Sequence, residues 1–415
     1  MAKIKSISAR EILNSKGEPS IETKIVLNNG VFACASVPSG ASVGSYEAFE
    51  LRDYDKKRYF GRGVLRAVSK VNEIIAPALI GLDPAKQVEI DRKLIALDDT
   101  PDKSNLGANS ILSVSLACAR VAALVNKKDL FVYLQETYSF DKPQIPVPLF
   151  NVFNGGKHAD TNLDFQEFLY IPKKSSAKEM IRQGAEVFHF LGKELKEAGY
   201  DTDVGQEGGY APDLDSSVEA LELISAAAIR AGYQPKVDFH LGIDVGSSVL
   251  FEQNTKRYVF TLDKAYFQAD SLISLYESWL ERYPIIYIED GLAEDDFENW
   301  RRLTTDLGSK CLLVGDDLFA TNVSRLRTGI QEKLANAIII KPNQVGTLTE
   351  TVDCVKLAVK HNYKIIVSHR SGETNDDFIV DLAVACGADY LKAGSLSRGE
   401  RLAKYNRLLE IEDKL

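Results

Sequence analysis

The sequence predicts an α/β protein in which a smaller N-terminal α+β domain precedes a C-terminal β/α barrel of the TIM-like kind. In the C-terminal two-thirds, short apolar runs alternate with helical stretches, and each run is followed by polar residues. Near-continuous apolar runs are typical of parallel strands that are buried on both faces. A proline-rich segment, Asp141–Pro148, precedes this region and marks a boundary. We therefore place the N-terminal domain at residues 1–136 and the barrel at residues 143–415.

The N-terminal domain is expected to begin with strands and continue with helices. Residues 3–36 are expected to form strands, with a hairpin at Asn29-Gly30, because Asn-Gly is a strong signal for a tight turn between strands. Residues 60–135 have helical periodicity, which is clearest at Ala108–Val125. Between these regions, the loop at residues 38–45 is rich in small residues and has the composition of a mobile lid.

Six apolar runs are expected to form parallel strands of the barrel: Phe239–Ile243, Pro284–Ile288, Cys311–Val314, Ala337–Ile340, Tyr363–Val367 and Ala388–Leu391. Their polar ends are Asp244, Glu289-Asp290, Asp316-Asp317, Lys341, Ser368-His369-Arg370-Ser371 and Lys392. The later ends follow one another at intervals of roughly 25 residues, the length of one strand and one helix with their loops. A single acid after a strand often only caps the next helix. Six polar ends in register favour an active site, because barrel enzymes carry their catalytic residues at these positions.

Three of these ends, Asp244, Glu289 and Asp316, predict a metal site. Three carboxylates on neighbouring strands repel one another strongly unless a hard cation neutralises them. Oxygen ligands without paired Cys or His favour Mg²⁺ over Zn²⁺. The alternative is three separate surface salt bridges, which accounts poorly for their shared position after apolar runs.

Two lysines, Lys341 and Lys392, follow the carboxylates in strand order. A lysine acts as a base only when it is neutral, and nearby cations lower its pKa by disfavouring the charged form. Either lysine alone is more simply read as a surface residue with its stem packed on apolar groups. Together with the metal site they favour acid–base chemistry.

Two glycine-containing segments lie outside the strand ends. Glu207 in Gln206-Glu207-Gly208-Gly209 suggests a carboxyl group on a tight loop near a ligand. An ordinary turn is the alternative reading, and the same alternative applies to Asn154-Gly155-Gly156-Lys157-His158. Residues 39–45 lack the Gly-Lys-Ser/Thr ending of a nucleotide-binding P-loop.

Composition narrows the class of protein further. The 415 residues carry a net charge of −9, which argues against a broad nucleic-acid surface. The apolar stretch Ile111–Val125 contains Arg120 and is too short to span a bilayer. We expect no signal peptide, because no apolar segment follows the first lysines. The five scattered cysteines suggest reduced thiols and a cytoplasmic location.

The sequence resembles the enolase family over nearly its whole length. The matching segments begin with Ala9-Arg10-Glu11-Ile12-Leu13, Pro38-Ser39-Gly40-Ala41-Ser42, Glu47-Ala48-Phe49-Glu50-Leu51-Arg52-Asp53 and Leu106-Gly107-Ala108-Asn109. They continue with Asn154-Gly155-Gly156-Lys157-His158-Ala159, Phe165-Gln166-Glu167-Phe168, Glu207-Gly208-Gly209 and Gly315-Asp316-Asp317-Leu318. They end with Lys341-Pro342-Asn343-Gln344-Val345-Gly346-Thr347, Ser368-His369-Arg370-Ser371-Gly372-Glu373-Thr374 and Lys404-Tyr405-Asn406-Arg407-Leu408-Leu409. So many matches in order leave little room for coincidence.

The resemblance implies a glycolytic lyase that dehydrates 2-phosphoglycerate reversibly to phosphoenolpyruvate with two Mg²⁺ ions per active site. It also implies an enolase-type barrel with a slightly irregular start and a homodimer or a higher homo-oligomer. Asp244, Glu289 and Asp316 would hold the first Mg²⁺, and Ser42 on the lid would help to bind the second together with the substrate phosphate.

The remaining implied roles belong to residues that act on the substrate. Lys341 would take the proton from C2, and Glu207, assisted by Glu167, would help hydroxide to leave from C3. The other substrate-binding residues would be Lys392 for the carboxylate, Arg370 and Ser371 for the phosphate, and Gln166 and His158, with His158 closing over the ligand.

The sequence departs from the usual family pattern at four positions. Gln206 stands where the family generally has Asp, Val43 replaces Thr, Lys16 replaces Arg and Asn375 replaces an acid. These changes bear on rate and stability more than on the type of reaction.

One rival reading is a catalytically weakened homologue that serves as a binding or scaffold protein, which predicts the loss of a catalytic residue. Another is a superfamily relative that acts on a different carboxylic acid, which predicts the loss of the phosphate-binding residues.

Overall fold

The computed structural model describes residues 2–40 and 44–415. The N-terminal part begins with a three-stranded antiparallel sheet of β1 (Ile4–Leu13), β2 (Pro19–Leu27) and β3 (Phe32–Val37). The predicted hairpin joins β2 to β3, where Gly30 adopts a φ of +87° and its N–H donates to the carbonyl of Leu27 at 3.0 Å. Glycine accepts this left-handed conformation without steric cost, which explains the turn.

Helices follow the sheet, as the periodicity predicts. They are α1 (Leu65–Ser69), a π-helical turn at Lys70–Ile75, α2 (Ala76–Leu79), α3 (Gln87–Asp98), α4 (Ala108–Val125) and α5 (Leu130–Tyr138), with a short 3₁₀ turn at Tyr59–Gly61 before them. Helix α4 packs on β2 and β3. Among the described residues it is the one helix that is long and apolar enough to cross a membrane, but 83% of that stretch is buried inside the fold. It is therefore the core helix of this part.

The C-terminal part is a closed eight-stranded barrel, which confirms the predicted fold class. Its strands are β4 (Val147–Asn154), β5 (Glu167–Pro172), β6 (Phe239–Asp244), β10 (Ile285–Glu289), β11 (Leu312–Gly315), β12 (Ala337–Ile340), β13 (Lys364–Ser368) and β14 (Tyr390–Lys392). The six predicted runs correspond to the last six of these. Strand β5 runs antiparallel to both β4 and β6, whereas the other neighbours in the barrel are parallel.

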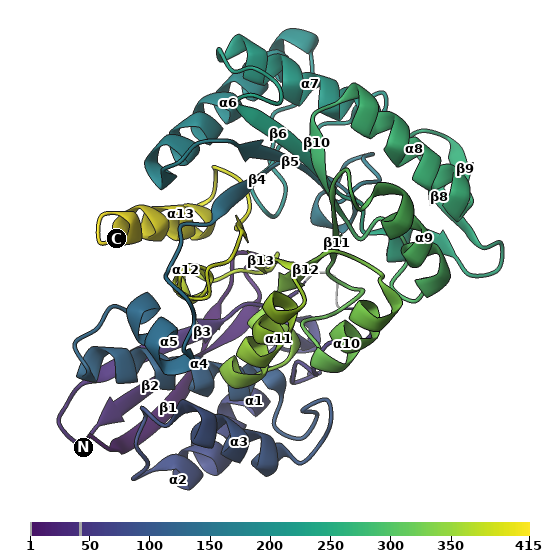
Figure 1. The fold of residues 1–415 in the computed structure, drawn as a ribbon. Helices are drawn as coiled ribbons and strands as arrows, with labels where there is room; N and C mark the ends of the chain where they lie inside the picture. The colour runs from purple at the N-terminus through teal and green to yellow at the C-terminus, as the bar shows by residue number, and fades with distance from the viewer. Residues whose placement is uncertain (1, 41–43) are drawn as a thin grey trace.

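Helices surround the barrel and connect its strands (Figure 1). They are α6 (Ala177–Ala198), α7 (Ser217–Arg230), α8 (Ala269–Arg282), α9 (Phe297–Leu307), α10 (Val323–Glu332), α11 (Leu348–Lys360), α12 (Phe378–Ala385) and α13 (Gly399–Glu412). Short 3₁₀ turns lie at Gly156–His158, Ser247–Val249 and Pro342–Gln344. A small sheet of β7 (Phe251–Glu252), β8 (Arg257–Phe260) and β9 (Ala265–Phe267) extends from the connection between β6 and α8.

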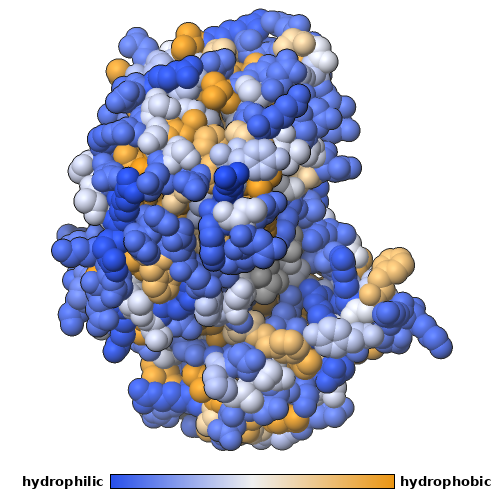
Figure 2. Space-filling view, turned by 90° about the vertical axis from the view of Figure 1, so that its right-hand side faces the viewer, coloured by the Kyte–Doolittle hydropathy of each residue, from blue (hydrophilic) through white to orange (hydrophobic). Residues whose placement is uncertain are grey.

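The interior of the barrel is packed with side chains. Its buried apolar cluster consists of Leu149, Leu169, Ile171, Tyr287, Val314, Ala337, Ile339 and Ile366. A barrel filled in this way is a solid core, so chemistry is restricted to the ends of the strands. The outer face in Figure 2 is mostly hydrophilic, with small separate hydrophobic patches, as is usual for a globular surface.

The N-terminal part packs against the barrel through α3, α4 and α11. The carboxylate of Asp91 on α3 accepts hydrogen bonds from the backbone N–H and the hydroxyl of Thr349 at 2.9 and 2.6 Å. Lys103 forms a 2.8 Å ion pair with Glu350. In Figure 1 the N-terminal helices and sheet lie beside β12, β13 and α11. The backbone N–H of Ser39, shortly after β3, donates to the carbonyl of Gly372 in the barrel at 2.9 Å.

Candidate active site

Three carboxylates stand side by side at the mouth of the barrel. Glu167 is paired with Asp244 across β5 and β6, and Asp244 is paired with Glu289 across β6 and β10. Because β5 runs in the opposite direction, its first residue lies at the same edge as the last residues of its neighbours. All three side chains are buried. Mutual repulsion of this kind needs a cation to offset it.

Lys392, at the end of β14, supplies positive charge to this row. Its Nζ lies 3.0 Å from Glu167, 3.0 Å from Asp244 and 2.8 Å from Glu289. Burial alone would lower the pKa of Lys392, but Asp244, Glu167 and Glu289 outweigh burial and raise that pKa well above its ordinary value. The lysine is therefore held in its charged form, which suits a group that neutralises an anion.

Lys341 follows β12 and forms an ion pair with Asp316, which follows β11. Burial would lower the pKa of Lys341, but Asp316 outweighs burial and raises it above the ordinary value. The sequence argument expected neighbouring cations to lower this pKa. Arg370 and Lys392 do act in that direction, and the carboxylate at Asp316 overrides them. Lys341 can act as a base only when Asp316 is engaged by another cation.

A second cluster surrounds Glu207, which lies on the loop between α6 and α7. Asn151 on β4 donates to its Oε2 at 2.9 Å, and His158 Nδ1 lies 3.5 Å from it. His369 Nε2 approaches the same oxygen to 3.6 Å. Burial would raise the pKa of Glu207, but His158, His369 and Arg401 lower it well below its usual range.

Glu167 titrates in the opposite direction from Glu207. Burial is the largest cause, and although Lys392 opposes it, the pKa of Glu167 is raised to about 7. His158 Nδ1 lies 3.4 Å from this carboxylate, so the histidine contacts both acids. Two close carboxyl groups whose pKa values are driven apart form a pair that holds one proton between them, which is a common arrangement for acid–base work.

Arg370 and Ser371 follow β13 and are both buried. The Arg370 guanidinium donates to Glu47 at 2.7 and 3.1 Å and to the side-chain oxygen of Asn343 at 3.0 Å. Glu47 follows the predicted lid, so this contact links the N-terminal part to the barrel. A planar guanidinium beside a buried hydroxyl provides the donors that bind a phosphate group.

The predicted site residues lie together, with one outside the described part of the chain. One cavity is lined by His158, Gln166, Glu167, Glu207, Asp244, Asp316, Lys341, Ser368, His369, Arg370, Ser371 and Lys392, and the neighbouring Glu289 contacts Lys392. Gln166 packs closely on Gly246: a Cβ at residue 246 would lie 1.8 Å from Nε2 of Gln166, so only glycine fits at that position. Ser42 and Val43 lie outside the described residues.

The carboxylates at the mouth fit a hard cation. Among the described residues, the acidic or histidine groups whose ligand atoms lie within 4.8 Å of one another are Asp290 with Asp316 and Asp317, and His158 with Glu167 and Glu207. The predicted set of Asp244, Glu289 and Asp316 is neither of these groups and shares only Asp316 with the first. Its three carboxylates lie at the ends of neighbouring strands, where they pair with Lys392 and Lys341. Oxygen donors of this kind suit a divalent ion such as Mg²⁺.

Asp290 holds part of this mouth in place. Its carboxylate oxygens accept the backbone N–H groups of Asp316 at 3.0 Å and Asp317 at 2.9 Å. Burial, followed by Asp317 and Asp316, raises the pKa of Asp290 well above its ordinary value. The residue also has a φ of +43°, which is strained for a side chain other than glycine. Strain of this kind persists where the surroundings fix a functional geometry.

The structure adds residues to the site that the sequence argument did not assign. His369 was recognised as a polar strand end but was given no role, and it contacts Glu207. Asn151 lies within an ordinary apolar strand, and Arg401 lies within helix α13. Because neither has a motif around it, only the fold reveals that Asn151 donates to Glu207 and that Arg401 contacts His369.

Three of the four departures from the family pattern, Gln206, Lys16 and Asn375, lie in the described part of the chain, and Val43 does not. Gln206 donates its backbone N–H to the carbonyl of His158 at 2.9 Å, while its Oε1 is buried without a hydrogen-bond partner among the described residues. Lys16 lies 3.8 Å from Glu18, and Asn375 is exposed.

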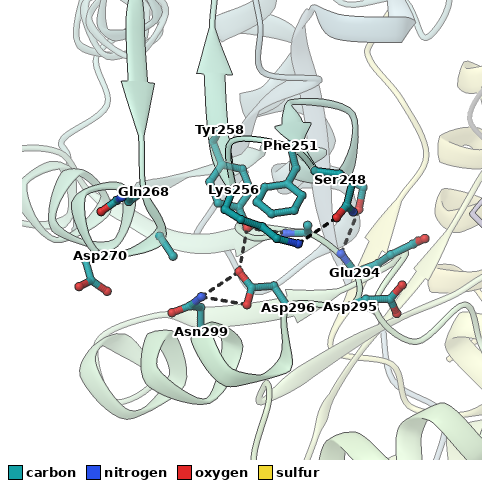
Figure 3. A pocket seen from close by; sticks show the side chains of 13 residues that line it. Ser248, Phe251, Lys256, Tyr258, Gln268, Asp270, Glu294, Asp295, Asp296 and Asn299 are labelled. Carbon is teal, nitrogen blue, oxygen red and sulfur yellow. Dashed lines mark hydrogen bonds between the residues drawn. The ribbon is translucent and has the colours of Figure 1, made fainter.

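A larger cavity, of about 600 Å³, lies away from this mouth between the β7–β9 sheet and the start of α9 (Figure 3). Its wall carries carboxylates with partners of their own: Asp296, for example, accepts from Asn299 at 2.9 and 3.0 Å. Lys256 points along the wall and donates to Gln253 at 3.2 Å. The paired lysines and convergent acids of the strand ends are not among its lining residues.

The fold and the site define a β/α-barrel protein with an acidic, lysine-bearing site at the ends of its strands. Comparison with known families agrees. Residues 4–134 match the enolase N-terminal domain, and residues 142–415 match the enolase C-terminal TIM barrel domain. The chain therefore belongs to the enolase family.

Proposed function

We propose that this protein dehydrates 2-phosphoglycerate reversibly to phosphoenolpyruvate, with Lys341 as the base and Glu207 as the acid. The observation that carries the proposal is that Lys341 and Glu207, from different elements, line one buried cavity. The elimination removes a proton from C2 and hydroxide from C3. Because these atoms lie on adjacent carbons, the base and the acid must be two separate groups that reach one substrate.

The chemistry of the first step explains the charges at the mouth. A proton next to a carboxylate is very weakly acidic, because its removal adds negative charge to a group that is already an anion. Lys392, held protonated, provides an ammonium group for that carboxylate. Mg²⁺, when bound by Asp244, Glu289 and Asp316, would stabilise the same developing charge.

The other residues would orient the substrate. Arg370 and Ser371 have the donors for the phosphate, and we propose that Ser42 adds to them from the lid together with a second Mg²⁺. His158 and Gln166 also line the cavity, and His158 Nδ1 lies 3.4 Å from Glu167 and 3.5 Å from Glu207. Because the pKa of Glu207 is lowered well below its usual range and that of Glu167 is raised to about 7, the proton that the pair holds rests on Glu167. We propose that Glu167 assists by passing this proton to Glu207, which places it on the departing hydroxide. A homodimer is the expected assembly.

Retention of the reacting groups favours an enzyme over a weakened homologue that only binds partners. The described chain keeps Lys341, Glu207 and the carboxylates of Asp244, Glu289 and Asp316. Lys341 is half-buried and the four acids are buried, and all of them line the cavity except Glu289, which contacts it through Lys392. A scaffold protein has no need to keep buried charges together, because they cost stability. The Arg370–Ser371 pair likewise favours a phosphorylated substrate over another carboxylic acid.

The roles of base and acid can be separated by following exchange of the C2 proton of 2-phosphoglycerate in deuterated water. In Glu207→Gln, the base is intact, so exchange at C2 should continue while phosphoenolpyruvate formation falls by about 10²–10⁴-fold. In Lys341→Ala, exchange and product formation should both be lost. Proton NMR of the substrate reports the exchange.

A matched control is Asp296→Asn, which lies in the separate cavity and should leave both rates unchanged. Exchange that stops in Glu207→Gln but continues in Lys341→Ala would reverse the two roles. Exchange that continues in both variants would place the base elsewhere.

A further inference from the structure

Arg401, on α13, is a buried cation to which neither the sequence argument nor the proposed reaction gives a task. Its exposed fraction is 0%. The side chain fits because residue 394 is glycine: a Cβ there would lie 2.7 Å from Arg401 Cδ. Burying an arginine is costly unless its donors are satisfied, so the partners of this guanidinium indicate what it is for.

Most of these partners are carbonyl groups of two catalytic segments. Nη1 donates to the carbonyl of Arg370 at 2.8 Å, and Nη2 donates to the carbonyl of Ser371 at 2.7 Å. Nη2 also reaches the carbonyl of Gln206 at 3.1 Å. The rigid guanidinium of Arg401 therefore hydrogen-bonds both the loop that contains Glu207 and the turn that contains Arg370 and Ser371.

Nε lies 3.3 Å from a carboxylate oxygen of Glu400 but has no hydrogen-bond partner among the described residues. The contact that bears on the site is with a ring nitrogen of His369. Arg401 Nη1 lies 2.5 Å from His369 Nδ1. A guanidinium has only donors and keeps its charge in proteins, so Nδ1 must accept the hydrogen bond and cannot carry a proton. The ring is then neutral, and its one proton is on Nε2. That nitrogen faces Oε2 of Glu207 at 3.6 Å, a separation that can shorten when substrate binds.

Burial and the cations around His369 also favour a neutral ring. Burial lowers the pKa of His369 most, Glu207 opposes it, and Arg401, Lys392 and Lys341 lower it further, so that the pKa lies well below its ordinary value. The backbone N–H of His369 donates to the carbonyl of Lys392 at 2.9 Å, which fixes the ring's position between these groups.

We infer that Arg401 is a positioning residue that fixes His369 as a neutral donor, with its proton on Nε2 directed at Glu207. It also holds the Glu207 loop against the Arg370–Ser371 turn. The inference rests on the proposed function in treating Glu207 as the acid, but the tautomer itself does not depend on turnover. Its consequence is that His369 donates a hydrogen bond to the acid and stays neutral during the cycle.

A purely structural role for Arg401 would look like that of its neighbour Lys404. Lys404 lies on the same helix, is equally buried, and contacts Glu373 at 2.8 Å and the carbonyl of Thr374 at 2.7 Å. It makes the same kind of bridge to the same turn without touching His369. Lys404→Met is therefore a matched control for the loss of a buried cation from α13.

The direct test is ¹⁵N NMR of the full chain labelled at histidine, with the His369 signals assigned by comparison with His369→Gln. We expect the wild-type protein to show His369 protonated at Nε2 and unprotonated at Nδ1 from about pH 6 to about pH 8, across the range in which an ordinary histidine titrates. A proton on Nδ1, or an imidazolium within that range, would overturn the inference. This readout uses a variant only to assign the signals and needs no substrate or turnover, so it is separate from a failure of the proposed reaction.

Variants then show whether Arg401 is responsible. Arg401→Lys keeps the charge but loses the fork, so the His369 signals should move toward a mixture of tautomers, and kcat should fall by about tenfold or more with a smaller change in KM. Lys404→Met should leave the His369 signals in place even if it lowers Tm. Unchanged signals in Arg401→Lys, or the same change in Lys404→Met, would refute the positioning role.

Discussion

At the scale of single residues, an excess of negative charge governs the mouth of the barrel. Lys392 faces three carboxylates and Lys341 faces one, and burial strengthens each interaction because water is excluded. Burial and Asp244 raise the pKa of Glu289 well above its ordinary value, which shows that the lysines do not fully offset the repulsion. A divalent ion would complete the neutralisation and release Lys341 from Asp316.

Asp290 provides a residue-level prediction about that ion. Asp290→Asn replaces one of the two oxygens that accept the N–H groups of Asp316 and Asp317 with an amide NH₂, which cannot accept. The Asp316 carboxylate should then be less well oriented, and the Mg²⁺ concentration needed for half-maximal activity should rise by about tenfold. Activity measured against Mg²⁺ concentration checks this.

The control for Asp290 is Asp296→Asn, a carboxylate further along the connection from β10 to α9 whose partners lie in the outer cavity. It should leave the Mg²⁺ dependence as in the wild type. Equal effects in the two variants would mean that Asp290 acts through overall stability and does not position Asp316.

At the scale of elements, the sequence predicted the parallel strands well because their physical signal is local. The run Ala337–Ile340 coincides with β12, and Ala108–Val125 coincides with α4. Strands β4 and β5 were not predicted individually. Strand β5 is a buried antiparallel strand in a parallel barrel, and its direction is set by the strands on either side of it, which no local pattern records.

The candidate site shows the same limit. The residues that follow the strands could be predicted from the sequence. They recur at regular intervals along the chain, and the ends of successive parallel strands lie close together at one edge of a barrel. Asn151 and Arg401 could not be found, since their contacts with Glu207 and His369 depend on how distant segments pack. The direction of the pKa of Lys341 was also missed, because it depends on the pairing with Asp316.

The contact of α3 with the start of α11 carries an element-level prediction. Burial raises the pKa of Asp91 to about 6, although Thr349, Ser115 and Gln87 donate hydrogen bonds to the carboxylate. The folded state therefore binds this proton more tightly than the unfolded state does. The stability that it contributes is present below about pH 4 and is lost as pH rises through about 6.

The measurement is urea unfolding of the wild type and of Asp91→Asn, which cannot ionise. The free energy of unfolding of the wild type relative to the variant should fall by about 2–3 kcal/mol between about pH 4 and about pH 7. Asp306→Asn, at an exposed position on α9, is the control. A difference for Asp91 that stays constant or grows with pH would contradict the prediction.

At the scale of the whole molecule, the site needs both parts of the chain. The last residue of the predicted lid and the residue after it contact the barrel: Ser45 donates to Glu294 at 2.8 Å, and Tyr46 donates to Asp295 at 2.9 Å. The Arg325 guanidinium lies 3.5 Å from the centre of the Tyr46 ring, and Glu47 pairs with Arg370. The N-terminal part therefore helps to hold a phosphate-binding residue, although the two are far apart in the sequence.

The most direct test of the central claim is the appearance of phosphoenolpyruvate absorbance when the protein is mixed with 2-phosphoglycerate, with Mg²⁺, then with a chelator, and beside Lys341→Ala. We expect turnover with Mg²⁺, none with the chelator, and none in the variant even with Mg²⁺, because the base and the metal act on the same proton. Absence of turnover by the wild-type protein with Mg²⁺, or full turnover by Lys341→Ala, would contradict the account.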